Sequence, residues 1–287
     1  MNSKKTNNLI SVENAQEIIF SKFKKLETIK KKLIDSSGFI LEKEIKALFD
    51  LPNKNNSAMD GFAVRHEDLE PNKSLKVVGR VGAEAITDYI LKKDEALRIM
   101  TGSGIPEGAD SVVPFEKTNN NPHKGNDFPD SVLINETVKK GDNIRLSGQD
   151  YKFGETVVKG GMLIDPPIVG AIASFGINEV SVIRKPMVSV ISTGNELVMP
   201  GDKLKEGQIY DSNSFAISAA IKNSGADFKM HRILSDNKED VDKLYEDCSQ
   251  SDLIVTIGGV SKGDFDLIRD AISSKGSIDF WGINMKP

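Results

Sequence analysis

The last hundred residues alternate between short apolar runs and amphipathic segments, and this alternation restricts the fold more than any other feature. The apolar runs at 187–193, 228–234, 253–257 and 278–281 predict strands, and 214–223, 238–249 and 265–273 predict helices. Strands that alternate with helices indicate right-handed βαβ crossovers and a parallel sheet covered on both faces. We therefore predict an α/β domain whose ligand binds beyond the carboxyl ends of its strands.

Composition narrows the class of protein. The chain has 287 residues, enough for two or three domains, with a formal net charge of −4 that gives no electrostatic reason to expect nucleic acid. Cys248 is the single cysteine, so an intramolecular disulfide and a thiolate zinc cage are excluded. No apolar run approaches the roughly 18 residues of a membrane span, and no signal-peptide core is present. A soluble cytoplasmic protein is expected.

The first 184 residues contain three stretches of different pattern. Apolar residues at helical spacing predict a helix over 11–34 with Ser11 as N-cap, and its lysines form a solvated face. Between 52 and 140, alternating runs such as 75–78 and 96–100 predict a small, mostly β domain with an exposed loop at 119–130. Glycine and proline punctuate 141–184 around a short apolar helix near 168–175. The chain stops directly after a predicted strand, and we expect it to be a piece of a longer protein.

The loop after the 253–257 strand has the composition of an anion site. It supplies Gly258, Gly259, Ser261 and Gly263 ahead of a helix predicted near Asp264. Glycines allow close backbone approach, and a helix N-terminus presents free N–H groups to an anion. Two carboxylates, on Asp264 and Asp266, would repel a bare phosphate, so the loop predicts a phosphorylated ligand bridged by a divalent metal, or one with hydroxyl donors.

Three more polar clusters fall on the same predicted sheet edge. Glu196 follows the first strand, Ser212 and Asn213 precede the next helix, and Asp236 follows the second strand. Each alone is also explained as a helix cap or turn residue. Together on one edge they favour a ligand site.

Four motifs in sequence resemble the molybdopterin molybdenumtransferase (MoeA) family, which also forms the C-terminal part of gephyrin. The motifs are NSAMDGFAVR at 56–65, RIMTGS at 98–103 with PEGADSVVP at 106–114, STGNEL at 192–197, and GGVSKGDFD at 258–266. The resemblance implies an elongated α+β linker and dimerisation domain (1–51 and 141–184), a β-rich inserted domain (52–140) and a molybdopterin-binding α/β domain (185–287). The family's C-terminal β domain is expected to be absent.

The resemblance implies an enzyme of molybdenum cofactor biosynthesis. Such enzymes take adenylylated molybdopterin and molybdate, or the nearly isosteric tungstate, and release AMP with Mg²⁺. It further implies a homodimer supplied by a molybdopterin adenylyltransferase, with Asp60 reaching the site from the partner subunit.

The residue roles implied by the resemblance extend those from the sheet edge. Asp60, Thr101 and Asp266 are expected to be catalytic, although Asp60 also fits a turn before glycine and Thr101 a loop hydroxyl. Substrate binding is expected at Glu196, Ser212, Asn213, Asp236, Gly258, Gly259, Ser261, Gly263, Arg145 and Lys286. Metal binding is expected at Asp60, Glu196, Asp236, Asp264 and Asp266. Arg145 suits an oxyanion or a surface salt bridge equally.

One departure affects the charge of the site. Relatives carry a Lys-x-x-x-Lys-Pro-Gly pattern, whereas Gly282 stands at the first lysine here and only Lys286 remains. Two alternatives stay open: a binding or scaffold protein that holds the molybdopterin nucleotide without turnover, and a nucleotide-processing enzyme that shares only the last domain. The second lacks the motifs at Asp60 and Thr101.

Overall fold

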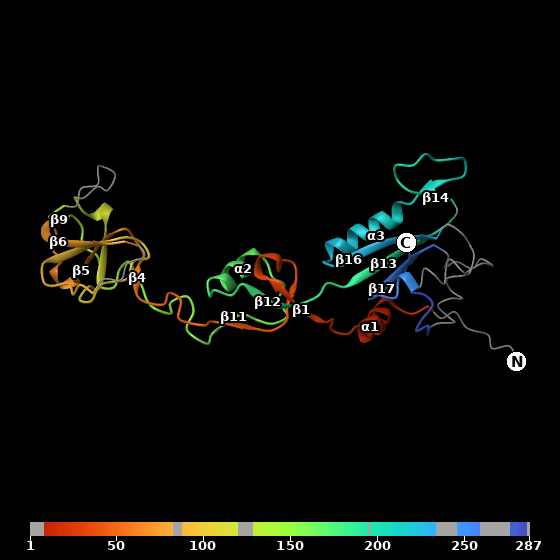
Figure 1. Ribbon diagram of the computed structural model, residues 1–287, viewed down its shortest axis with the longest axis horizontal. Coiled ribbons are helices and arrows are strands. Elements are labelled where there is room, and N and C mark those ends of the chain that lie inside the picture. The colour runs from red at the N-terminus through yellow and green to blue at the C-terminus, as the bar shows by residue number, and fades with distance from the viewer. Residues whose placement is uncertain are drawn as a thin grey trace. The chain divides into compact units, whose positions relative to one another are not determined.

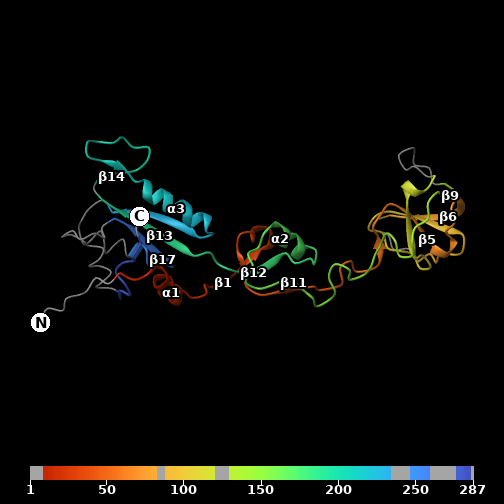
Figure 2. The ribbon, with the colours of Figure 1, turned by 180° about the vertical axis from the view of Figure 1, so that it is seen from behind.

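A computed structural model describes residues 9–82, 88–119, 129–194, 196–233, 246–258 and 276–285. The chain divides into two compact units, of which unit 1 comprises 1–43, 161–169 and 178–287 and unit 2 comprises 44–160 and 170–177. Figures 1 and 2 show the ribbon from opposite sides. Within the described ranges, no helix has both the length and the apolar character needed to cross a membrane. The three-domain boundaries stay a prediction.

Unit 1 contains the parallel sheet that the alternation predicts. Its order is β16 (Asp227–Ile233), β13 (Met187–Thr193) and β17 (Leu253–Ile257), and both pairings with β13 are parallel. The buried residues of β13, Val188 to Ser192, explain its apolar run. Thr193 pairs with Ile233 and Ser192 with Ile257, so the three carboxyl ends lie at one edge.

A helix packs on this sheet and starts at its carboxyl edge. Helix α3 (Ser212–Asn223) contacts β13 and β16 and lies alongside them in Figure 1. It begins two residues before the predicted start because the Asp211 carboxylate accepts a hydrogen bond from Ser214 N–H at 3.1 Å. Two short parallel strands, β14 (Leu197–Val198) and β15 (Ile209–Tyr210), join β13 to α3.

The N-terminal segment corrects the prediction of one helix over 11–34. Helix α1 spans only Val12–Lys22, with the predicted Ser11 cap confirmed by the bond from Asn14 N–H to Ser11 Oγ. Residues Thr28–Lys32 instead form β1, which pairs along its whole length with β12 (Glu179–Ile183). Ile29 fits both a helical and an alternating pattern, and pairing with β12 decides between them. The third strand of this sheet is β2 (Ile40–Leu41).

Unit 2 is β-rich, as predicted. Its main sheet has the order β8-β5-β7-β6-β9, and only the β6–β7 pair is parallel. The strands are β5 (Gly61–Val64), β6 (Lys73–Val81), β7 (Glu95–Ile99), β8 (Ser111–Pro114) and β9 (Ser131–Ile134). Side chains on its two faces form two apolar clusters, one around Phe62 and Phe115 and the other around Leu97 and Ile99.

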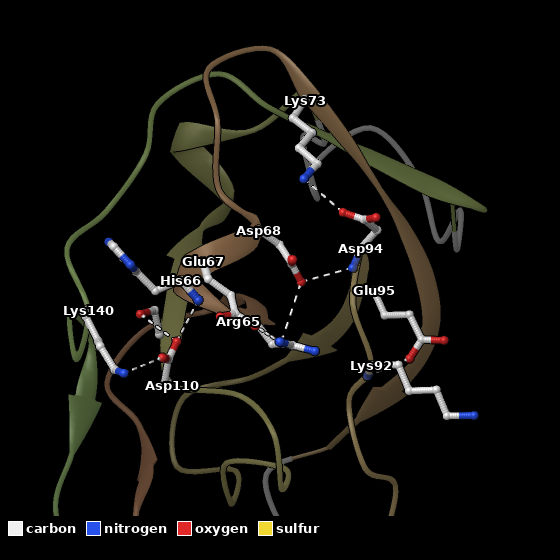
Figure 3. A network of polar contacts seen from close by, with 11 residues as sticks. Arg65, His66, Glu67, Asp68, Lys73, Lys92, Asp94, Glu95, Asp110 and Lys140 are labelled. Carbon is white, nitrogen blue, oxygen red and sulfur yellow. Dashed lines mark hydrogen bonds and ion pairs between the residues drawn. The ribbon is translucent and has the colours of Figure 1, made fainter.

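A polar network lies at the C-terminal end of β5, the end opposite Asp60 (Figure 3). Buried Asp68 accepts a hydrogen bond from Asp94 N–H at 2.9 Å, and Asp110 accepts one from His66 N–H at 2.6 Å. Burial acts to raise the pKa of Asp110, but the His66 amide and Lys140 outweigh it, so the net pKa is lowered. These hydrogen bonds hold the turn that follows β5, and the carboxylates that accept them are paired.

The remaining elements are short, and one predicted strand is wrong. Two further pairs are antiparallel, β3 (Ile45–Lys46) with β11 (Thr156–Val158) and β4 (Asn56–Ser57) with β10 (Ile144–Arg145). Helix α2 (Pro166–Ala173) confirms the predicted apolar helix. No strand forms at 278–281; the described neighbourhood holds a single bridge between Ile283 and Ile10. Ile278 and Trp281 are exposed, so that run has no buried face to favour pairing.

Candidate functional site

Two predicted catalytic residues of unit 2 contact each other. Thr101 donates two hydrogen bonds to Oδ1 of Asp60, from its backbone N–H at 2.7 Å and from its hydroxyl at 2.8 Å. Both residues are exposed. Asp60 therefore presents a fixed carboxylate, with Oδ2 unused by Thr101, to whatever binds at this surface.

The backbone around Asp60 is held by close packing of neighbouring strands. Gly61 pairs with Ile99 of β7 and Pro114 of β8, and a Cβ added to it would lie 2.1 Å from the Val113 carbonyl oxygen. Only glycine fits there, which explains the Asp-Gly pair in the motif. Ser57 adds a local tie, because its hydroxyl donates to the Met59 carbonyl at 2.6 Å.

A second cluster lies at the carboxyl edge of the parallel sheet in unit 1. Gly258 directly follows β17 with φ +85°, and a Cβ there would lie 2.9 Å from the Thr193 carbonyl oxygen. Gly194 follows β13, and a Cβ on it would lie 2.6 Å from both carboxylate oxygens of Glu196. The two strand ends thus approach each other through glycines, with the exposed Glu196 carboxylate folded against Gly194.

Ser212 and Asn213 occupy the first turn of α3 and are exposed. Two backbone bonds connect this turn to the Glu196 segment, from Ile209 N–H to the Glu196 carbonyl and from Asp211 N–H to the Val198 carbonyl, both 2.9 Å. The first-turn N–H groups carry the positive end of the helix dipole. An anionic group of a ligand at this edge could bind the N–H groups and the side chains of Ser212 and Asn213 in the first turn of α3.

Arg145 has a partner other than a ligand. Its guanidinium pairs with the Asp150 carboxylate at the surface of unit 2, and Arg145 faces Asn56 in the β10–β4 pair. The salt bridge is one of the two alternatives that the sequence leaves open. Its role as an oxyanion ligand stays a prediction.

The other predicted site residues lie outside the described residues; they are Asp236, Gly259, Ser261, Gly263, Asp264, Asp266 and Lys286. In the part of the chain that is described, no group of three or more His, Cys, Asp or Glu could hold a metal ion. Asp60 and Glu196 are exposed carboxylates, the hard oxygen donors that suit Mg²⁺, which takes one or two carboxylates together with phosphate oxygens.

Sequence reasoning missed two supporting residues. Asp211 caps α3, a role that its position three residues before Ser214 could have indicated. Thr193 forms the wall against Gly258 through its carbonyl and hydroxyl oxygens, and nothing in the sequence pattern marks that contact.

Family comparisons cover nearly the whole described chain. Residues 10–176 match the family described as MoeA N-terminal region (domain I and II), and residues 189–287 match the probable molybdopterin binding domain.

The chain is also similar to individual proteins of this family. A molybdopterin molybdenumtransferase of Staphylococcus epidermidis is 36% identical over 271 residues, covering 92% of this chain and 63% of the relative. One of Staphylococcus aureus is 33% identical, covering 98% and 67%. The crystal structure of a molybdopterin biosynthesis MoeA protein of Pyrococcus horikoshii aligns with a TM-score of 0.75 at 32% identity, covering 98% of this chain and 70% of that one. The chain thus spans about two thirds of its relatives' length.

Proposed function

The chain belongs to the MoeA family, and from that premise we propose that it acts in molybdenum cofactor biosynthesis as a molybdopterin molybdenumtransferase. The substrates are adenylylated molybdopterin and molybdate. The phosphoanhydride bond is hydrolysed, so that AMP leaves and the pterin keeps its own phosphate, and molybdate exchanges two of its oxygens, lost as water, for the two dithiolene sulfurs of the pterin. A molybdopterin adenylyltransferase supplies the adenylylated pterin.

The observation that carries the proposal is the contact between Asp60 and Thr101. Two donors on one carboxylate oxygen restrict the Asp60 side chain, which is the preorganisation that a catalytic group needs. We assign Asp60 a catalytic role and Thr101 the role of orienting it.

The carboxyl edge of the parallel sheet is assigned to the nucleotide part of the substrate. Gly258 permits close approach of a phosphate, the first turn of α3 offers N–H donors, and Glu196 offers an acceptor for ligand hydroxyls or a metal. Mg²⁺, when bound, would neutralise phosphate charge. Glu196 is the described residue of unit 1 that would hold it, with Asp236, Asp264 and Asp266 as further ligands, and Asp60 is the metal-binding carboxylate that we propose for unit 2.

AMP release from adenylylated molybdopterin tests the proposal directly. It should depend on molybdate and fall by about a hundredfold or more in Asp60→Asn, while the affinity for the pterin nucleotide changes little, because the amide keeps the acceptor for Thr101 but lacks the charge. Asp130→Asn, which changes another exposed carboxylate of unit 2, is the matched control. Equal losses of affinity and AMP release in Asp60→Asn would refute the catalytic assignment. Binding without release in the unaltered chain would instead support the binding-only alternative.

We also propose a homodimer. Helix α1 carries Phe20 at 71% exposure, and Phe23, directly after it, is 54% exposed, so an apolar surface is left for a partner to cover. Sedimentation equilibrium of the chain at micromolar concentration measures this. A monomer under those conditions would contradict the dimer.

A further inference from the structure

Two arginines on one face of the main sheet of unit 2 have no anionic partner among the described residues. Arg98 of β7 lies directly beside Arg80 of β6 in the parallel register, so both side chains project from the same face. Directly paired residues have Cβ atoms about 5 Å apart, and like charges at that spacing destabilise a sheet. Neither arginine forms an ion pair with any residue in the described part of the chain, whereas Arg65 and Arg184 do.

Arg98 is the more constrained of the two. It is half-buried, and its Nε is buried without a hydrogen-bond partner among the described residues. Its guanidinium carbon lies 5.2 Å from the centroid of the Phe115 ring, and Phe115 in turn contacts Phe62 edge-on at 5.4 Å. The aromatic ring holds the guanidinium in place but satisfies none of its N–H groups.

A guanidinium with a buried, unpartnered Nε is partly desolvated, and an anionic ligand would offset that cost. Arg80 is exposed, so the pair runs from a half-buried position to the surface and remains accessible. Asp60 lies two residues before Phe62, which pairs with Arg98 between β5 and β7. The Asp60 carbonyl also accepts a hydrogen bond from the N–H of Phe115 at 3.2 Å. Its carboxylate is nevertheless held by Thr101 and forms no ion pair with Arg98. Two guanidiniums against one carboxylate leave a net positive charge.

We propose that Arg80 and Arg98 form a binding site for a tetrahedral oxyanion, either free or as the phosphate of a larger ligand. The planar guanidinium of Arg98, fixed on Phe115, donates in parallel to two oxygens of the anion, and Arg80 closes the site from the solvent side. The inference rests on these two side chains and not on the proposed reaction, so loss of AMP release would leave it standing.

Binding of inorganic phosphate, molybdate and AMP to the full chain, by calorimetry and by thermal shift, tests this at ionic strength matched with chloride. The wild-type chain should show a saturable rise in Tm of about 2–4 °C at ten times Kd. Arg98→Met keeps the contact with Phe115 and removes the charge; Arg80→Gln changes an exposed residue and should fold normally. Each should weaken binding about tenfold or more. Lys76→Gln removes one positive charge from the other face of β6 and should leave Kd unchanged.

The probes separate the two sources of the anion. Binding of phosphate or molybdate indicates a free oxyanion, and binding of AMP alone indicates the phosphate of a larger ligand. Arg98→Met should also leave the Tm of the ligand-free chain unchanged or higher, because it removes the buried, unpartnered Nε and keeps the contact with Phe115. The proposal is overturned if no probe binds better than chloride, or if Lys76→Gln weakens binding as much as the arginine variants do. Should Arg98→Met fail to fold, Arg80→Gln decides.

Discussion

Gly61→Ala should loosen the strand that positions Asp60. The added Cβ would lie 2.1 Å from the Val113 carbonyl oxygen and 2.9 Å from the Pro114 Cα, both backbone atoms of β8. Ordinary contact needs more than 3 Å, so β5 and β8 must separate by about 1 Å or more. Overpacking of this kind costs about 1–3 kcal/mol, and two weakened ladder hydrogen bonds add about 1 kcal/mol each. We expect the local stability of β5 to fall by about 3–5 kcal/mol.

Hydrogen exchange at the amides of Phe62 to Val64 measures this change locally, which matters because a chain of two units need not unfold in one transition. A loss of about 3 kcal/mol lowers protection there by about a hundredfold. Gly82→Ala is the matched control, since it follows β6 in the same unit and a Cβ there meets nothing within 4 Å. Protection in Gly61→Ala within tenfold of that in Gly82→Ala would refute the argument that backbone crowding requires this glycine.

Two further substitutions test the ends of elements in unit 1. Arg184 bonds the carboxylates of Asp252 and Glu27 and holds the pKa of Asp252 at about 2, chiefly by hydrogen bonding. The Asp252 carboxylate thus contributes stability present above its ordinary pKa of 3.8 and lost as pH falls through about 2. The urea midpoint of Arg184→Gln should therefore lie below wild type at pH 5 and converge with it towards pH 2; a constant gap would contradict this. Ser11→Ala should lower the stability of α1 by about 1 kcal/mol, seen as faster exchange of the Asn14 amide, whereas Ser21→Ala, at the other end of the helix, should leave that amide unchanged.

The parallel sheet of unit 1 could be predicted closely because its signals are local. The bounds predicted for β13 and β17 agree with the structure, since each is an apolar run between polar residues. The N-terminal segment could not, because Ile29 and Leu33 continue the helical spacing of α1. Only hydrogen bonding to β12, about 150 positions away, makes 28–32 a strand.

The site residues also divide into those that local sequence predicts and those that it does not. Gly258 directly follows β17 and Glu196 comes shortly after β13, so the position of a strand predicts their position at the sheet edge. Arg145 shows the limit: its motif suits an anion and a salt bridge equally, and the Asp150 carboxylate that it contacts depends on how the intervening turn folds. The local sequence around Arg145 therefore does not decide between an anion site and a salt bridge.

Asp60 and Thr101 are 41 positions apart and become one site only through the register of β5 against β7, in which Gly61 pairs with Ile99. A slip of one residue would turn the Phe62 face of β5 away from its apolar cluster and carry Asp60 away from the Thr101 amide. The register is strongly specified because β5 is buried throughout and Gly61 fits only where β8 approaches most closely. The packing of a buried strand therefore fixes the position of the exposed Asp60 carboxylate. The motifs at 56–65 and 98–103 are brought together where Gly61 pairs with Ile99.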